Sequence, residues 1–395
     1  MKGDKKMVAG HLTEKKGYYY AVINFKDGNG KRKTKWFSTG LKVEGNKRKA
    51  DAILTDIRCN FDVEKENSKA NDAANALFSD YLEDWLKVVK STIAVTTYSS
   101  YCSMVRKIIA PYFKNKRTRL KNLKAKDIQD FYLIQLERVK ATSVIHYHAV
   151  IHKALKYAVK IDLIDVNPSD KVELPRKEKY IANYYKAEEI NKMLELSKST
   201  KLEIPLLIAS FYGLRRSEVI GLKWDAIDFE NNIITINHTV TKTNIDGKSQ
   251  IVLLDSTKSQ SSLRCLPLVP FIKIRLEQLK EEQDQNRKKY GRSYNKAYIG
   301  YLCVNETGDI ISPDNLTKSF KLFLKRNGLK EIRFHDLRHS CASLLLANGV
   351  PMKQIQEWLG HSDYSTTANY YAHLDFNSKW TSANAMITGL GYDKK

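Results

Sequence analysis

The amino-acid sequence predicts a multidomain protein that is mainly α-helical and contains small β-sheets. Its 395 residues are enough for two or three domains of roughly 100–200 residues each. Hydrophobic residues make up 42% of the chain, which is enough to build packed cores. Strand-like patterns come first, a wholly helical stretch follows, and a mixed α+β region ends the chain. We therefore expect three domains, over residues 1–65, 73–175 and 183–395.

The first domain is expected to be a three-stranded sheet backed by one helix. Aromatic and β-branched residues indicate strands, and an Asp-Gly-Asn-Gly sequence indicates a hairpin turn. We expect a strand over Gly17–Phe25, a turn at Asp27–Gly30 and a second strand over Lys31–Phe37. Ser38–Gly40 is expected to break that strand, and a helix is expected over Arg48–Phe61. Asn46 is the expected N-cap of this helix.

The hairpin of the first domain is basic, and its second strand carries Lys31, Arg32, Lys33 and Lys35. A two-stranded ribbon has the right width to enter the major groove of DNA. A solvated hairpin that only keeps the domain soluble would have the same composition. Both interpretations remain open from this segment alone.

Residues 73–175 have the pattern of a helical bundle. Apolar residues recur at helical spacing and form a core stripe, namely Phe78, Leu82, Trp85 and Val89. Further helices are expected over Val95–Phe113, Lys126–Arg138 and Thr142–Ile161. The domain is also basic, and its candidate DNA contacts are Lys90, Arg106 and Lys107.

The third domain mixes helices and strands. The expected helices are Lys186–Leu196, Leu202–Tyr212, Ile272–Gln285 and one beyond Pro313. The expected strands are Ile233–Ile236, Ile251–Leu254 and Arg264–Val269. Two more helices open near Phe334 and Pro351, and the expected buried face of the first is Leu337, Cys341, Leu344 and Leu345.

Charge and cysteine content narrow the classes of function. The chain has 67 Lys and Arg against 44 Asp and Glu, a net charge of +23, which favours nucleic acid as a partner. A basic protein charged only for solubility is the alternative. The five cysteines are far apart, which argues against a zinc ribbon or a disulfide scaffold and fits a reducing cytosol. The start of the chain lacks a signal peptide's apolar core, and no stretch is long and apolar enough to cross a bilayer.

Polar motifs in the third domain stand at positions that helix patterns alone do not explain. Gly213 ends one helix just before the next begins, so Arg215 lies on a corner between the two. His335 and Arg338 are three residues apart and share one helix face. A guanidinium fork beside a second donor suits a pair of anionic oxygens.

Five motifs follow one another in a fixed order: Gly213-Leu-Arg-Arg-Ser-Glu218, Thr257-Lys258 ahead of Leu266-Pro-Leu268, His335-Asp-Leu-Arg-His339, Leu359-Gly-His361 and Tyr371-Ala-His373. In order and spacing they resemble the catalytic set of the tyrosine recombinase (phage integrase) family. The helical domain likewise resembles that family's SAM-like core-site-binding domain. The N-terminal hairpin resembles the arm-site-binding domain of lambda-type and conjugative-transposon integrases. Each motif alone is weak evidence, but five in order are strong evidence.

The resemblance implies that Tyr371 is the nucleophile, which attacks a DNA phosphodiester and forms a 3′-phosphotyrosyl link. Tyr370 lies beside it, but the family places its tyrosine two residues before the histidine. Arg215 and Arg338 would clamp the two non-bridging oxygens, where negative charge increases in the transition state.

The remaining motif residues have supporting roles in the family. Lys258 would protonate the departing 5′ oxygen, and His335 would act as a base or a hydrogen-bond donor. His361 would hold a phosphate oxygen, and Glu218 would orient Arg215. Arg216 is a candidate contact to the DNA backbone.

The resemblance also implies a function and partners. The protein would integrate and excise a mobile element, a conjugative transposon or a prophage, as a homotetramer on double-stranded DNA. It would bind core and arm attachment sites, with an excisionase and a host DNA-bending protein as accessory partners. It would be a bacterial or phage-encoded protein that acts in the cytoplasm at the nucleoid.

Two alternatives use the same fold. A non-catalytic DNA-binding regulator predicts a broken active set, whereas every position is filled here. A type IB topoisomerase-like enzyme would act as a monomer, and the N-terminal hairpin and the apolar tail after Tyr371 argue against it. That tail would pack on a neighbouring subunit or on its own domain. No cofactor is expected, and no metal either, because His335 and His339 have no evident third ligand.

Overall fold

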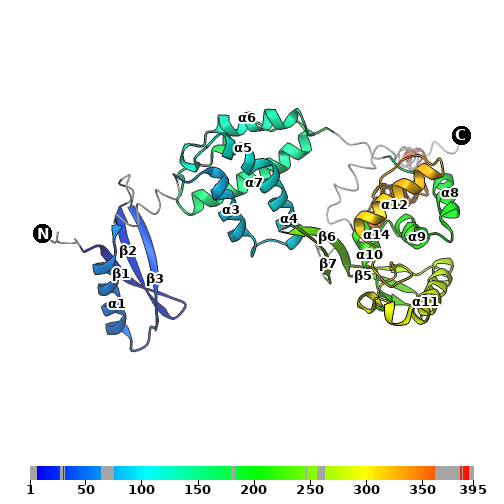
Figure 1. Ribbon diagram of the computed structural model, residues 1–395, viewed down its shortest axis with the longest axis horizontal. Helices are drawn as coiled ribbons and strands as arrows, with labels where there is room; N and C mark the ends of the chain where they lie inside the picture. Colours follow the sequence, from blue (N-terminus) through cyan, green and yellow to red (C-terminus); the bar gives the residue numbers. More distant parts are fainter. Residues whose placement is uncertain are drawn as a thin grey trace. The chain divides into compact units, whose positions relative to one another are not determined.

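The computed structural model divides the chain into two compact units, Met1–Glu178 and Lys179–Lys395. Figure 1 shows the elements of each unit along the chain. The structure describes residues 7–26, 30, 32–63, 75–178, 183–245, 247–255, 263–360, 383–384 and 386–390. Among these residues, no helix is both long and apolar enough to span a membrane.

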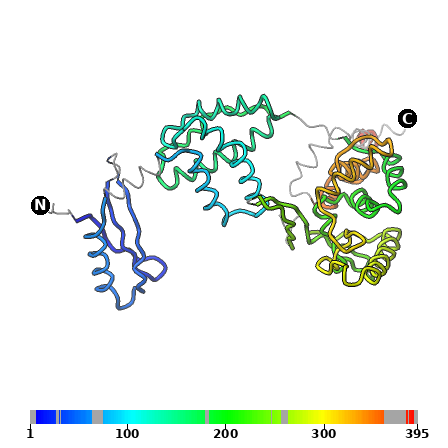
Figure 2. The backbone as a smooth tube through the Cα atoms, in the orientation of Figure 1, coloured from blue at the N-terminus to red at the C-terminus, as the bar shows by residue number. Residues whose placement is uncertain are grey.

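The first unit begins with the expected three-stranded sheet. Strands β1 (Ala9–Lys15), β2 (Tyr18–Lys26) and β3 (Arg32–Lys42) are antiparallel and pair in the order β1-β2-β3. Helix α1 (Lys47–Asn60) covers one face of the sheet, and its Leu54 packs against Ala21 and Ile23 of β2 (Figures 1 and 2).

One local prediction for this sheet is wrong, and one for α1 holds in position only. Strand β3 does not break at Ser38–Gly40 but continues to Lys42. The Thr39 hydroxyl donates to the carbonyl oxygen of Tyr19 (2.6 Å), Gly40 adopts φ +71°, and the pairing with β2 shifts register there. A bulge therefore absorbs the turn-like residues without ending the strand. Asn46 occupies the N-cap position of α1, but its Nδ2 donates backwards to the carbonyls of Lys42 and Glu44, so its side chain does not cap the helix.

The described residues from 75 to 171 are mainly helical, as predicted. Its elements are α3 (Phe78–Val89), α4 (Val95–Met104), the π-helical turn η1 (Val105–Ile109), α5 (Ala110–Asn115), η2 (Leu120–Asn122), α6 (Ala125–Leu136), α7 (Ala141–Lys160) and η3 (Pro168–Lys171). The predicted core stripe of α3 is buried along its whole length. The hydroxyl of Tyr81 in α3 donates to the carbonyl oxygen of Ala154 in α7 (2.6 Å), which joins the first and last long helices of the bundle.

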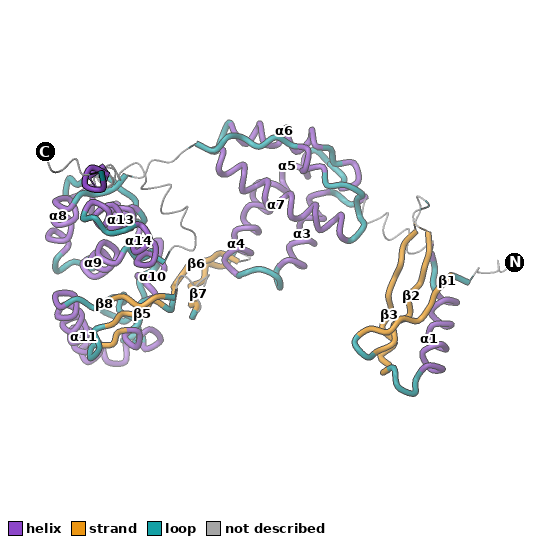
Figure 3. Tube along the Cα trace, turned by 180° about the vertical axis from the view of Figure 1, so that it is seen from behind, coloured by secondary structure: helices purple, strands orange, loops and turns teal. Residues whose placement is uncertain are grey.

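The second unit is mixed α+β. Among the described residues up to Gly360, its helices are α8 (Ala187–Ser197), α9 (Glu203–Tyr212), α10 (Arg216–Gly221), η4 (Trp224–Ala226), α11 (Pro270–Tyr290), η6 (Gly291–Ser293), η7 (Lys296–Tyr298), α12 (Pro313–Arg326), α13 (Asp336–Ala347) and α14 (Met352–Leu359). Its strands are β4 (Ile227–Asp228), β5 (Ile233–Ile236), β6 (Thr239–Ile245), β7 (Lys248–Leu254) and β8 (Arg264–Pro267). They form an antiparallel sheet, β4-β5-β8, and a separate hairpin, β6-β7 (Figure 3).

Two details of this unit differ from the sequence-based expectation. Strand β6 was not predicted, because Val240 is the only aliphatic residue between its ends and the other residues are polar. Leu344 of α13 was expected to be buried, but it is 36% exposed. The first two turns of α13 are instead enclosed on several faces, and Asp336 through Ser343 are all buried, polar residues included.

A glycine brings the elements of the candidate site together. Gly213 ends α9 with φ +63°, a left-handed conformation that glycine adopts without strain. A Cβ added there would lie 2.4 Å from Cδ2 of Leu359 in α14 and 3.2 Å from Sγ of Cys341 in α13. Three helices therefore meet at this turn, and only a residue without a side chain fits between them.

Candidate active site

Arg215 sits at the N-cap of α10, two residues after the Gly213 turn. Its Nη1 donates to Oε1 of Glu218 (2.6 Å), and its Nη2 donates to the carbonyl oxygen of Gly360 (3.0 Å). About a third of its side chain (34%) remains exposed. The guanidinium is thus held from two sides while part of it still faces solvent.

Glu218 is almost fully enclosed, with its side chain 2% exposed. Its Oε2 accepts hydrogen bonds from the backbone N–H of Arg215 (2.9 Å) and from Nη2 of Arg264 (3.1 Å). Burial alone would raise the pKa of Glu218, but the positive charges of Arg264 and Arg215 outweigh it and lower the pKa below its usual value. Glu218 is therefore a carboxylate at neutral pH, between two guanidinium groups.

His335 and Arg338 come from the start of α13 and lie beside this corner. Arg338 is buried, and its Nη1 donates to the carbonyl oxygen of Gly213 (2.8 Å). Desolvation by the surrounding protein lowers the pKa of His335 to about 4, and electrostatic interactions with His339, Arg338 and Arg215 add to the effect. His335 taken as a whole residue is nevertheless exposed. Its imidazole is therefore neutral at pH 7 and able to accept a proton.

The structure thus brings together four of the seven predicted catalytic residues: Arg215, Glu218, His335 and Arg338. The other three, Lys258, His361 and Tyr371, lie outside the described residues, as does Tyr370. Gly360, next to His361, is described, and so is Asp255, three residues before Lys258. Asp255, at the end of β7, accepts from Nζ of Lys223 (3.2 Å) and pairs with Nδ1 of His238 (2.7 Å).

Arg264 belongs to this cluster, although the sequence analysis did not single it out. It lies at the start of β8 and is 8% exposed. Its Nη2 contacts Glu218, and its Nε donates to the carbonyl oxygen of Trp358 (2.9 Å). One signal was available in the sequence: the strand alternation places Arg264 on the same face as Leu266, which is buried. A cation on the apolar face of a strand indicates a buried partner.

Some of the predicted DNA contacts are exposed, and others already bind neighbouring protein groups. Lys107 is exposed on η1, whereas Nε of Arg106 donates to the carboxylate of Glu83 (3.1 Å to Oε2). Arg216 lies within the second unit, where its Nη1 donates to Thr317 Oγ1 (2.6 Å) and to the Pro313 carbonyl.

The other predicted contacts are cations of the first unit. Nζ of Lys90 lies 5.8 Å from the ring centre of Tyr98. Arg32, Lys33 and Lys35 are on β3, and Lys31 lies outside the described residues. A DNA contact for these residues stays a prediction.

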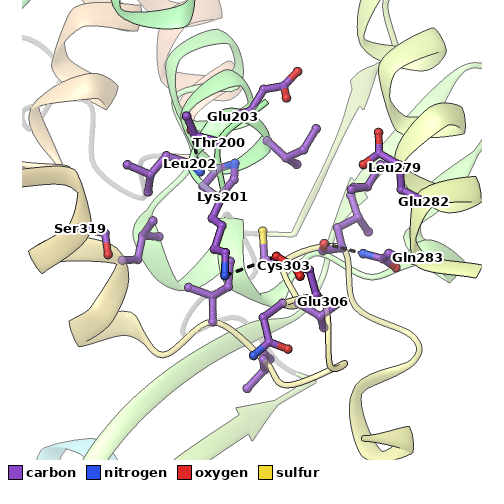
Figure 4. Close-up of a pocket in the computed structure, with 18 of the residues that line it drawn as sticks. Thr200, Lys201, Leu202, Glu203, Leu279, Glu282, Gln283, Cys303, Glu306 and Ser319 are labelled. Carbon is purple, nitrogen blue, oxygen red and sulfur yellow. Dashed lines mark hydrogen bonds and ion pairs between the residues drawn. The ribbon is translucent and has the colours of Figure 1, made fainter. Parts of the chain in front are cut away.

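A cavity of about 850 Å³ in the second unit is separate from this cluster. Figure 4 shows Glu203 and Glu282 on its wall, and Lys201 beside Glu306. None of the four clustered residues lines it. Within the described part of the chain, no group of three or more His, Cys, Asp or Glu residues is arranged to hold a metal ion.

Comparison with known protein families places this cluster in context. The profile of the phage integrase family matches residues 183–378, and that of the phage integrase N-terminal SAM-like domain matches residues 77–133. The chain is 29% identical to a tyrosine recombinase XerC-like protein of Caldanaerobacter subterraneus, over 92% of this chain and 94% of that protein. It is 31% identical to the prophage ps2 probable integrase of Lactococcus lactis, over 80% of this chain and 85% of that protein.

Solved structures share the fold at 17–18% identity. The Tn1549 transposon integrase in complex with a circular intermediate DNA superposes with a TM-score of 0.63, over 78% of this chain and 98% of that one. A lambda integrase tetramer bound to a Holliday junction superposes with a TM-score of 0.55, over 90% and 96%. The profile matches and the relatives together establish that the chain belongs to the phage integrase family of tyrosine recombinases, enzymes that break and rejoin DNA.

Proposed function

We propose that this recombinase integrates and excises a mobile element through a covalent 3′-phosphotyrosyl intermediate. The observation that carries the proposal is the convergence of Arg215, Arg338 and His335 at the Gly213 turn. Two fixed cations and a neutral imidazole in one corner suit a phosphodiester whose non-bridging oxygens gain charge during the reaction.

The reaction would proceed by in-line displacement at phosphorus. The phenolic oxygen of Tyr371 attacks, the bond from phosphorus to the 5′ oxygen breaks, and Lys258 donates a proton to that leaving oxygen. His335 is neutral at pH 7 and acts as the base that receives the tyrosine proton. Arg215, Arg338 and His361 hold the phosphate oxygens.

The phosphotyrosyl link conserves the energy of the broken phosphodiester. A 5′ hydroxyl from a second strand attacks the link, the tyrosine leaves, and its proton returns along the same groups. Strand exchange therefore needs no nucleotide cofactor.

The domains would divide the labour of DNA binding. Residues 1–65 would bind arm sites through Lys31, Arg32, Lys33 and Lys35. Residues 73–175 would bind the core site through Lys90, Arg106 and Lys107. Residues 183–395 carry the chemistry, and Arg216 contacts the DNA backbone next to it. The SAM-like profile match over residues 77–133 supports the second assignment.

Strand exchange would take place in a homotetramer, as the lambda integrase assembly on a Holliday junction suggests by analogy. A prophage or a conjugative transposon is the proposed element, and the prophage and transposon integrases among the similar proteins support it. An excisionase and a host DNA-bending protein would set the direction of the reaction. The protein would act in the cytoplasm at the nucleoid, where its DNA substrate lies.

The proposal is tested with nicked duplexes tiled across the DNA that flanks the protein's own gene. Each duplex loses a short fragment on cleavage, which traps the covalent adduct for a denaturing gel. Without metal, and with EDTA present, the wild-type protein and Tyr370→Phe should form an adduct, and Tyr371→Phe should form none. Specific DNA binding without any adduct would favour a non-catalytic regulator instead.

A further inference from the structure

We propose that Arg264 is a positioning residue that preserves the positive charge of Arg215 for the phosphate. Arg264 acts through Glu218 and does not touch DNA. This inference rests on the proposed function, because it assigns Arg264 a part in the same chemistry.

The geometry places Arg264 behind the catalytic corner. Its Nη2 lies 3.1 Å from Oε2 of Glu218, while Nη1 of Arg215 lies 2.6 Å from the other carboxylate oxygen, Oε1. Glu218 is therefore shared between two guanidinium groups, one on the partly exposed side and one on the buried side.

A carbonyl at the end of α14 holds the Arg264 guanidinium in place. Nε of Arg264 donates to the carbonyl oxygen of Trp358, and the neighbouring carbonyl of Gly360 accepts from Arg215. Both arginines are thus tied to the same helix end and to the same carboxylate. We therefore expect that removing one guanidinium changes the position of the other, because both are held by Glu218 and by the end of α14.

The charges explain why a second arginine is needed. Glu218 orients Arg215, but its negative charge also offsets the positive charge of Arg215. With no further cation, the pair would attract an anionic phosphate only weakly. Arg264 adds a second positive charge, so the three groups carry one net positive charge. Because Arg264 is buried and Arg215 is partly exposed, that net charge is presented on the side of Arg215.

The experiment compares five proteins in the nicked-duplex assay: wild type, Arg264→Gln, Arg264→Lys, Glu218→Gln, and Arg264→Gln combined with Glu218→Gln. Arg264→Gln should slow adduct formation about 10- to 100-fold, with DNA affinity unchanged. Arg264→Lys keeps the charge and should restore the rate to within about threefold of wild type. A role in packing alone would not be rescued by a side chain of different shape.

The double variant tests the route through Glu218. Once Glu218→Gln has removed the carboxylate, the added loss of Arg264 should slow the reaction no further than about threefold. This comparison, of Glu218→Gln with and without Arg264→Gln, remains valid if Arg264→Gln alone fails to fold. That single variant leaves a buried charge with one partner fewer, whereas the double variant removes both charges.

Arg275 supplies a matched control. It also pairs with two carboxylates, Glu203 (2.8 Å) and Glu282 (3.1 Å), but on the wall of the separate cavity. Arg275→Gln should leave the rate of adduct formation unchanged. Equal slowing by Arg264→Gln and Arg275→Gln, or a full Arg264 effect in the absence of the Glu218 charge, would overturn the inference. An inactive wild-type protein would instead refute the proposed function.

Discussion

Nη1 of Arg338 donates a hydrogen bond to the carbonyl oxygen of Gly213, 2.8 Å away and 125 residues earlier in the chain. This contact fixes the start of α13 against the turn that precedes Arg215. The positions of Arg215 and Arg338, which would clamp the phosphate, are therefore fixed by one backbone turn. The distance between the two arginines depends on how that turn packs.

Replacing Gly213 with alanine should lower the stability of the folded protein. The left-handed backbone costs alanine about 1 kcal/mol, and the new methyl group would overlap Leu359 at 2.4 Å. Gly328 is a matched control, because it has φ +60° with nothing within 4 Å of an added Cβ. In urea denaturation of the full chain, Gly213→Ala should cost about 1–3 kcal/mol more than Gly328→Ala, through overpacking. Equal losses would show that the turn is not tightly packed.

Arg338→Lys should slow adduct formation about 10²-fold while DNA affinity stays within about threefold of wild type. The ammonium keeps the charge but loses the planar fork that reaches both the Gly213 carbonyl and a phosphate oxygen. Arg333→Lys is the control, because Arg333 is 58% exposed and pairs with Asp336 (2.7 Å). Similar rates for the two variants would remove Arg338 from the clamp.

His335 should titrate well below an ordinary histidine. The folded-state pKa of about 4 lies below the usual value of 6.5. Above about pH 6.5 the ring is neutral in both the folded and the unfolded chain, so its titration costs the folded state no stability. As the pH falls from 6.5 towards 4, the unfolded chain binds a proton that the folded chain does not, and the free energy of unfolding decreases. Long-range ¹H–¹⁵N NMR of the imidazole should show a neutral ring down to pH 5. A midpoint near 6.5 would contradict the assignment of His335 as a neutral base.

Lys107→Ala should weaken DNA binding and reduce the salt dependence of the binding constant by about one unit of slope. Lys107 is exposed on η1. Lys87 of α3 is the control, because its Nζ already pairs with Asp84 (2.7 Å) on the surface. Fluorescence anisotropy with the core duplex at several salt concentrations measures both effects. An unchanged slope for Lys107→Ala would place the DNA elsewhere on this domain.

Local patterns predicted much of the fold. The stripe from Phe78 to Val89 identified α3, because a helix repeats every 3.6 residues whatever it packs against. Strand β3 was cut short in the prediction, because Ser38–Gly40 reads as a turn until the bulge with β2 is seen. Strand β6 was missed because its pairing with β7, rather than its own composition, makes it a strand.

In the candidate site, contacts between residues close in sequence were predictable, and contacts between distant residues were not. Arg215 and Glu218 are three residues apart at a helix start, so their contact follows from sequence spacing. Two partners of Arg264 are Glu218, 46 residues away, and the backbone of Trp358, 94 residues away. Backbone carbonyls leave no signature in a sequence, so a contact of this kind emerges only from the folded structure.

The most direct test of the central claim is to identify the residue that is joined to DNA. The trapped adduct is digested with nuclease and protease, and the nucleotide-bearing peptide is sequenced by mass spectrometry. We predict a single modified peptide with the phosphate on Tyr371. A phosphate on Tyr370 would shift the catalytic set by one residue, and a phosphate on serine would contradict the tyrosine mechanism altogether.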